Sequence, residues 1–117
     1  MCNSGVLNEL RDWGCDIDSA LNRMLGDEDF LLGCIRDVNN DESIKQLGEA
    51  LKEDNVKAAF FAAHNLKGIT SNTGITPLLN IIVIIVESLR NGKTAGLKDI
   101  YEELCLKNTE LSKILTK

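Results

Sequence analysis

The sequence predicts an all-α fold, an antiparallel up-down four-helix bundle with one or two short N-terminal helices laid across it. Only 4% of the residues are aromatic and there is a single proline, a composition that favours helices over strands. Apolar residues recur three and four positions apart through most of the chain, as in amphipathic helices. Helices joined by loops of about three to five residues pack as antiparallel neighbours. We place the core bundle at about residues 41–117 and the N-terminal helices at about residues 4–39.

Two glycines divide the first part of the chain into short segments. A first helix is expected to begin at a cap on Asn3 or Ser4 and to end at Gly14, because glycine readily adopts the left-handed conformation that terminates helices. Asp16 is the expected N-cap of a second helix, and Gly26 is the residue that stops it. The apolar stripe of this helix comprises Ile17, Leu21, Met24 and Leu25.

The next two segments also begin at aspartates. Asp27 opens a third helix, in which apolar residues recur at helical spacing up to Val38. Residues 39–41 combine a break with a cap, and a fourth helix follows to about Glu53. Gly48 interrupts this helix and indicates either a weak point or a close crossing of another helix.

The longest uninterrupted helical pattern lies between Asp54 and Gly74, and at roughly 1.5 Å per residue it runs for about 27 Å. One stripe of this helix faces the core and comprises Ala59, Ala63, Leu66, Thr70 and Thr73. A second stripe points away from the core and comprises His64, Lys67, Gly68 and Ser71. The only histidine of the chain is therefore expected to be exposed in mid-helix.

The apolar run at residues 81–86 would by propensity alone indicate a buried strand. We predict a helix instead, because a Thr-Pro pair at 76–77 is a start signal of cap and first-turn proline, and an Asn-Gly pair at 91–92 ends the segment. A single buried strand in an otherwise helical chain would also have no partner. After a linker at residues 93–96, a last amphipathic helix is expected from Leu97 onward.

Composition and charge limit the classes of function. The net charge is −5 and no block of lysine or arginine occurs, which argues against nucleic acid or a membrane as partner. The longest apolar run, residues 78–86, is far shorter than the ~20 residues of a membrane span, and no signal peptide is visible. The scattered cysteines predict neither a disulfide framework nor a zinc site; they are Cys2, Cys15, Cys34 and Cys105. We expect one cytoplasmic domain over residues 1–117, with no metal or cofactor of its own.

His64, Lys67 and Gly68 together have the chemistry of a phosphoryl site. A neutral imidazole nitrogen is a competent nucleophile near neutral pH. An ammonium group three residues further on can screen phosphoryl oxygens. Glycine in mid-helix costs about 1 kcal/mol relative to alanine, which indicates that another molecule must approach closely. From the residue types alone, an incidental histidine with a solvated lysine remains an alternative.

These residues belong to a longer pattern. Residues 63–74, from Ala63 and His64 to Gly74, resemble the A-H-x-L-K-G-x-x-x-x-x-G signature of histidine-containing phosphotransfer (HPt) domains. Residues 14–30 resemble the lead-in of bacterial members, whose pattern G-x-D-x-x-x-x-L-x-R-x-x-G-D they match through Asp27; Phe30 is the aromatic residue here where a tyrosine is common in the family. The last helical turn before Gly92 falls where the third bundle helix of the family usually ends. The resemblance extends from about residue 13 to the C-terminus. The chain resembles the free-standing bacterial type of HPt protein, and an excised fragment of a larger kinase is the alternative.

The resemblance implies a four-helix bundle that acts as a phosphorelay intermediate in two-component signalling. His64 would accept a phosphoryl group on Nε2 from the phosphoaspartate of a response-regulator receiver domain and pass it to another receiver. Lys67 matches the residue that stabilises the phosphoryl group, and Gly68 the residue that leaves room for the receiver. The chain would be a carrier and not an enzyme, since Mg²⁺ and the catalytic groups belong to the receiver. The resemblance implies that the chain is a monomer and that its partners are receiver domains and a hybrid histidine kinase.

The candidate partner-binding residues are Phe61, Asn65 and Ser71. Phe61 stands where many members of the family carry a charged or polar residue. It either widens an apolar docking patch or marks the boundary of the core.

Three other functions remain open at this point. The chain could bind receivers or kinases without carrying phosphate, as a pure interaction module. It could be a metal- or thiol-based enzyme that pairs His64 with Cys34 or Cys105. It could also be a structural bundle in which the histidine is incidental.

Overall fold

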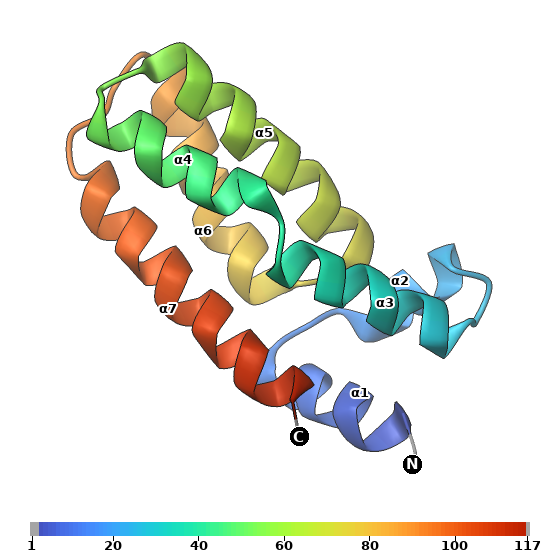
Figure 1. The fold of residues 1–117 in the computed structure, drawn as a ribbon. Coiled ribbons are helices and arrows are strands. Elements are labelled where there is room, and N and C mark those ends of the chain that lie inside the picture. The colour runs from blue at the N-terminus through green and yellow to red at the C-terminus, as the bar shows by residue number, and fades with distance from the viewer. Residues whose placement is uncertain (1–2, 117) are drawn as a thin grey trace.

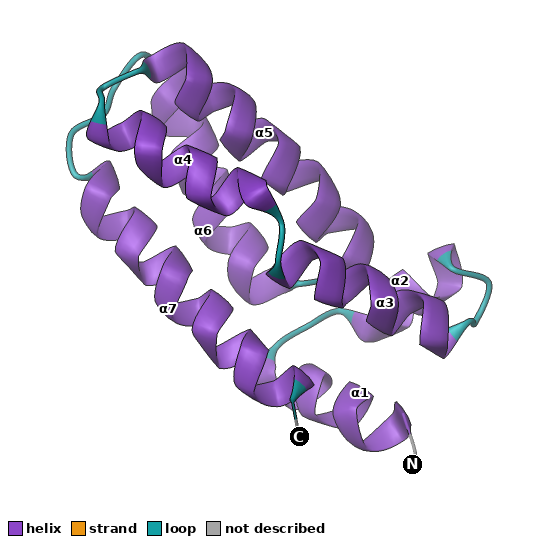
Figure 2. Ribbon diagram, in the orientation of Figure 1, coloured by secondary structure: helices purple, strands orange, loops and turns teal. Residues whose placement is uncertain are grey.

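Every regular element in the computed structural model is an α-helix (Figures 1 and 2). The structure describes residues 3–116, and no strand occurs in this range, so the all-α prediction is confirmed. The helices are α1 (Asn3–Trp13), α2 (Ile17–Arg23), α3 (Glu28–Asn39), α4 (Glu42–Lys52), α5 (Val56–Thr73), α6 (Thr76–Arg90) and α7 (Leu97–Leu115). The apolar run at residues 81–86 lies inside α6, as predicted. None of the described helices has the length and apolarity to cross a membrane.

The four C-terminal helices pack on one another in sequence order. α4 contacts α5, α5 contacts α6 and α6 contacts α7, while α7 also contacts α4. Successive helices of this set run in opposite directions (Figure 1). Each contributes side chains that are almost completely buried, among them Leu47, Leu66, Ile82 and Leu104. This arrangement gives α5 one buried face and one outer face.

Three helices precede α4, which confirms the three segments marked out in the sequence, whereas the expected number of one or two short N-terminal helices is wrong. Gly14 and Gly26 have positive φ angles of 119° and 80°, and the chain turns at each of them. Asp16 and Asp27 follow and cap α2 and α3, each by accepting a hydrogen bond from a first-turn backbone N–H. Gly14 therefore closes α1 shortly before Asp16 begins α2, whereas α2 has already ended at Arg23 before the chain reaches Gly26.

Two expected helix starts are also wrong by a residue or two. α1 already includes Asn3 and Ser4, so neither is its cap, and Cys2 lies outside the described residues. In α6 the N-cap is Ile75 and not Thr76, which is already the first helical residue. No side chain caps the start of this helix. The reason is visible in the backbone, where the Leu79 N–H already donates to the Ile75 carbonyl oxygen at 2.9 Å.

The end of α2 differs from the sequence pattern as well. α2 stops at Arg23, and Leu25, which the pattern placed in an apolar stripe, is 95% exposed. Its φ angle is 56°, because the chain already turns there on its way to Gly26. A left-handed conformation is unusual for leucine, and it directs this side chain away from the core.

Polar contacts fix the N-terminal helices against α7. The Asn39 side-chain amide donates to Asn108 Oδ1 at 2.8 Å, and the Asn108 amide donates to the Asn39 carbonyl at 3.0 Å. The Ser112 hydroxyl donates to Asn39 Oδ1 at 3.1 Å. Trp13 Nε1 donates to Glu110 Oε1 at 2.9 Å, which lowers the pKa of that carboxyl group.

Gly48 marks a close crossing of α4 and α7, one of the two readings that the sequence allowed. A methyl group on this glycine would overlap the Tyr101 phenol. The Tyr101 hydroxyl donates to the Ile44 carbonyl oxygen at 2.8 Å, and burial raises the pKa of the phenol. The glycine thus serves packing within the molecule.

Candidate functional site

The candidate site lies on the outer face of α5. Asn55 caps the start of this helix through a side-chain hydrogen bond, and Gly74 ends it in the left-handed conformation with a φ of 72°. The predicted inner stripe is buried, with Ala63 and Leu66 on either side of the histidine fully inaccessible to solvent. His64 is exposed in mid-helix, so its predicted position is confirmed.

The imidazole of His64 lies beside an aromatic ring that is itself held in place. The ring centroids of Phe60 and His64 are 5.8 Å apart, with an interplanar angle of 35°. The guanidinium carbon of Arg90 lies 5.6 Å from the Phe60 centroid, within the range of a cation–π contact. Arg90 also pairs with Glu87 at 3.3 Å. None of the described residues hydrogen-bonds to the imidazole, so its ring nitrogens can meet an incoming group.

Lys67 and Gly68 stand one turn further along α5. Lys67 is half-buried, and no described residue forms an ion pair with its ammonium group. A methyl group on Gly68 would have no neighbouring atom within 4 Å, apart from its own helix backbone and adjacent residues. Packing inside the molecule therefore does not require glycine at this position, in contrast to Gly48.

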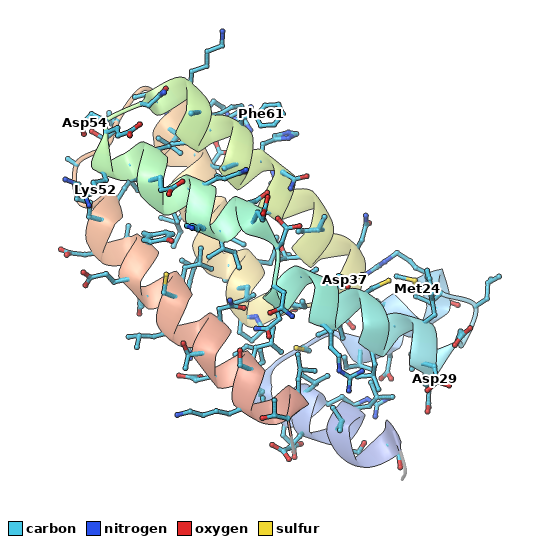
Figure 3. All side chains as sticks on the ribbon, in the orientation of Figure 1. Met24, Asp29, Asp37, Lys52, Asp54 and Phe61 are labelled. Atoms are coloured by element: carbon cyan, nitrogen blue, oxygen red, sulfur yellow. The ribbon has the colours of Figure 1, made fainter. Side chains whose placement is uncertain are left out.

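The three candidate partner-binding residues differ in what they contact. Phe61 is 78% exposed and its ring points away from the bundle (Figure 3), so it is not a boundary residue of the core. Phe61 and Asn65 help to line a surface hollow beside His64. The Asn65 amide donates to the Ser43 hydroxyl of α4 at 2.7 Å and so also ties the two helices together. Ser71 is exposed on the outer face.

The two parts of the sequence pattern meet at the C-terminal end of α5. The Asp16 backbone N–H donates to the Gly74 carbonyl oxygen at 2.8 Å, and a methyl group on Gly74 would overlap the Asp16 carbonyl oxygen. Arg23 donates to two of the last carbonyl oxygens of α5, at 2.9 Å to Ser71 and 3.1 Å to Asn72. The lead-in segment therefore holds the end of the helix that carries the histidine.

Sequence reasoning missed the residues that support the histidine. Phe60 precedes His64 by four positions, and helical spacing alone could have placed the two rings side by side. Arg90 comes from α6 and Arg23 from α2, and both contacts depend on how distant helices pack. The lead-in pattern includes the arginine at position 23, but no local signal in the sequence indicates what Arg23 or Arg90 contacts.

The described cysteines do not reach the hollow beside the histidine. Cys15 is buried, and burial raises the pKa of its thiol to about 12. Cys34 and Cys105 are half-buried, and neither of them lines the hollow that contains His64. Within residues 3–116, no group of three or more histidine, cysteine, aspartate or glutamate side chains is placed to hold a metal ion.

Comparisons with known proteins add no family assignment. No protein-family model matches the chain, and no curated protein or solved structure matches it.

Proposed function

We propose that this chain is a histidine phosphotransfer carrier of two-component signalling, with α4–α7 as its antiparallel up-down four-helix bundle. His64 accepts a phosphoryl group from the phosphoaspartate of a response-regulator receiver domain and passes it to another receiver. One observation carries the proposal: the outer face of α5 combines an exposed imidazole, an ammonium group at Lys67 and the open backbone at Gly68. No described residue hydrogen-bonds to the imidazole or forms an ion pair with Lys67.

The transfer needs position and charge from the carrier. The lone pair on Nε2 of His64 forms the N–P bond while the P–O bond to the receiver's aspartate breaks, and the carboxylate leaves with the electron pair. Such transfers pass through a loose transition state, so alignment and charge neutralisation dominate catalysis. The Lys67 ammonium offsets part of the charge on the phosphoryl oxygens. The return step is the reverse reaction on a second receiver.

The proposal assigns Mg²⁺ and the acidic groups to the receiver. The hollow beside His64 is lined by Phe60, Phe61 and Asn65 and offers no carboxylate. Oxygen ligands, above all carboxylates, are what Mg²⁺ prefers in proteins. This chain therefore acts as substrate and carrier, and the enzyme-like part of the reaction belongs to its partner.

The surroundings of the histidine suit brief docking. Gly68 leaves the helix backbone accessible, and the exposed Phe61 ring offers an apolar contact one turn before the histidine. Ser71 extends the same face, and Asn65 borders the hollow. Small interfaces of this kind are typical of transient signalling encounters. We assign this role to a cytoplasmic monomer that serves receivers and a receiver-bearing hybrid histidine kinase.

Incubation with a radiolabelled, phosphorylated receiver tests the proposal. Wild-type protein is expected to acquire acid-labile, base-stable phosphate, and His64→Gln to acquire none while it keeps the circular dichroism spectrum of the wild type. Wild-type protein that binds the receiver without taking label would instead be an interaction module. Label that persists in His64→Gln would place the phosphate elsewhere.

A further inference from the structure

A second surface feature lies beside the C-terminal half of α5, on the side that faces α3. A groove there has Ile69 and Asn72 of α5 on one wall. The other wall comes from α3 and its neighbouring turns and includes Met24, Phe30, Asp37 and Asp41. We refer to these six residues as the acidic groove; Figure 3 shows Met24 and Asp37 close to each other on this side of the molecule.

Apolar side chains near this groove are exposed without a role in the core. Phe30 is 57% exposed, and Leu25, which follows Met24 in the chain, is 95% exposed. These are two of the five large exposed apolar side chains among the described residues. Leu25 lies between α2 and α3, and Phe30 lies in the first turn of α3. Exposed apolar side chains beside a groove are typical of interaction sites.

The chain segment that forms the α3 side of this groove is acidic. Residues 17–42 contain seven acidic residues and two arginines, a net charge of −5 that equals the net charge of the whole chain. Arg23 donates to the end of α5, and Arg36 is one position from Asp37, so helical geometry places it on a different face of α3. The carboxylates of Asp37 and Asp41 are therefore the charged groups that line the groove.

From this combination we propose that the acidic groove binds a basic amphipathic helix of a protein partner. An apolar side chain of that helix enters between Phe30 and Ile69, and lysine or arginine on its flank meets Asp37 and Asp41. A groove between helices suits an amphipathic helix, which lays its apolar face into it. A second copy of this chain would bring the same negative charge, and an anionic lipid surface would also be repelled.

The proposal does not depend on phosphoryl transfer. Ile69 follows Gly68 directly in α5, and Asn72 lies one turn beyond it. A helix in the acidic groove would consequently lie next to the outer face that carries His64. Binding and transfer can be measured separately, so either can fail without the other.

The test uses a defined probe on the full chain. The probe is a fluorescent amphipathic peptide of leucine and lysine, about 18 residues long, and its partner peptide has glutamate in place of every lysine. We expect micromolar binding of the lysine peptide, no measurable binding of the glutamate peptide, and amide NMR shifts at Met24, Ile69 and Asn72. Asp37→Lys should weaken binding about tenfold, because it puts like charges in contact.

Two matched variants on α7 control for net charge and surface apolarity. Glu102→Lys makes the same charge change at another exposed carboxylate, and it should change the affinity less than about twofold. Phe30→Ser should weaken binding, whereas Leu106→Ser, which removes a slightly more exposed apolar side chain, should not. Circular dichroism confirms that each variant is folded.

Four results would overturn the proposal. Absence of binding would do so, as would equal losses for Asp37→Lys and Glu102→Lys, which would reduce the effect to net charge. Equal affinity for the glutamate peptide would remove the role of the carboxylates. NMR shifts at the same residues on raising the protein concentration alone would make a second copy the occupant.

Discussion

Replacement of Gly68 separates the stability of α5 from its function. A side chain at this position has open space, so Gly68→Ala and Gly68→Gln add helix propensity without a clash. Glycine is about 1 kcal/mol less favourable than alanine in a helix interior, and glutamine is close to alanine. We therefore expect the free energy of unfolding to rise by roughly 0.5–1 kcal/mol in both variants, and Tm to rise by about 4 °C.

The same glutamine should slow phosphoryl transfer. Its side chain would project from a position four residues beyond His64, on the same face of the helix, into the space that a receiver must enter. A misplacement of the reacting atoms by ~1 Å can cost about a hundredfold in rate, so we expect transfer from a phosphorylated receiver to fall at least tenfold. Gly68→Ala, with its single methyl group, should lose less.

Thermal unfolding and initial rates of label uptake measure the two effects. Gly33→Gln is the matched control, because Gly33 is also helical and a methyl group on it also meets nothing within 4 Å. It should gain stability in the same way and transfer at the wild-type rate. Transfer at the wild-type rate by Gly68→Gln would show that no partner requires the glycine, and destabilisation by Gly68→Ala would show that the molecule itself does.

Three further predictions follow from the same geometry. Lys67→Ala should slow label uptake about fivefold, because roughly 1 kcal/mol of charge interaction with the phosphoryl group is lost. Lys67→Arg should recover part of the rate. An unchanged rate in Lys67→Ala would show that the lysine has no part in the mechanism. Gly92→Ala should lower the free energy of unfolding by about 1 kcal/mol, because the backbone φ at this position is 70°. Gly74→Ala should lower it by at least about 1 kcal/mol more, because the added methyl group also displaces Asp16. Equal losses in chemical denaturation would contradict this. The Cys15 thiol keeps its proton up to about pH 12 in the folded protein and loses it near pH 9 in the unfolded chain. The unfolding free energy should therefore fall by about 1.4 kcal/mol per pH unit between these values. A denaturation series in which Cys15→Ala shows the same pH slope as the wild type would refute this prediction.

Helix boundaries could be predicted wherever a short polar side chain caps the next turn. Asp16 and Asp27 accept the first-turn hydrogen bond that their sequence positions indicated. Asp41 does so at the predicted break at residues 39–41, and Asn55 does so next to the predicted start at Asp54. Gly74 likewise ends α5 in the left-handed conformation. These signals are local, because the cap and the helix it serves lie within a few residues of each other.

Positions decided by tertiary packing were not predictable. Leu25 fits an apolar helical stripe in the sequence, yet the backbone turns before it can join the core. The outer position of His64, by contrast, was predicted correctly, because it depends on the helical period alone. The contact of Arg90 with Phe60 and of Arg23 with the end of α5 requires knowledge of which helices are neighbours.

The most direct measurement of the central claim is a two-step chase. Protein labelled by one phosphorylated receiver is purified, its phosphate is located by tandem mass spectrometry, and it is then mixed with an unphosphorylated receiver and Mg²⁺. We predict that the phosphate is on His64 and that the label leaves it in equal amount for the second receiver. Phosphate on another residue, or label that stays on this chain when the receiver is added, would contradict the account.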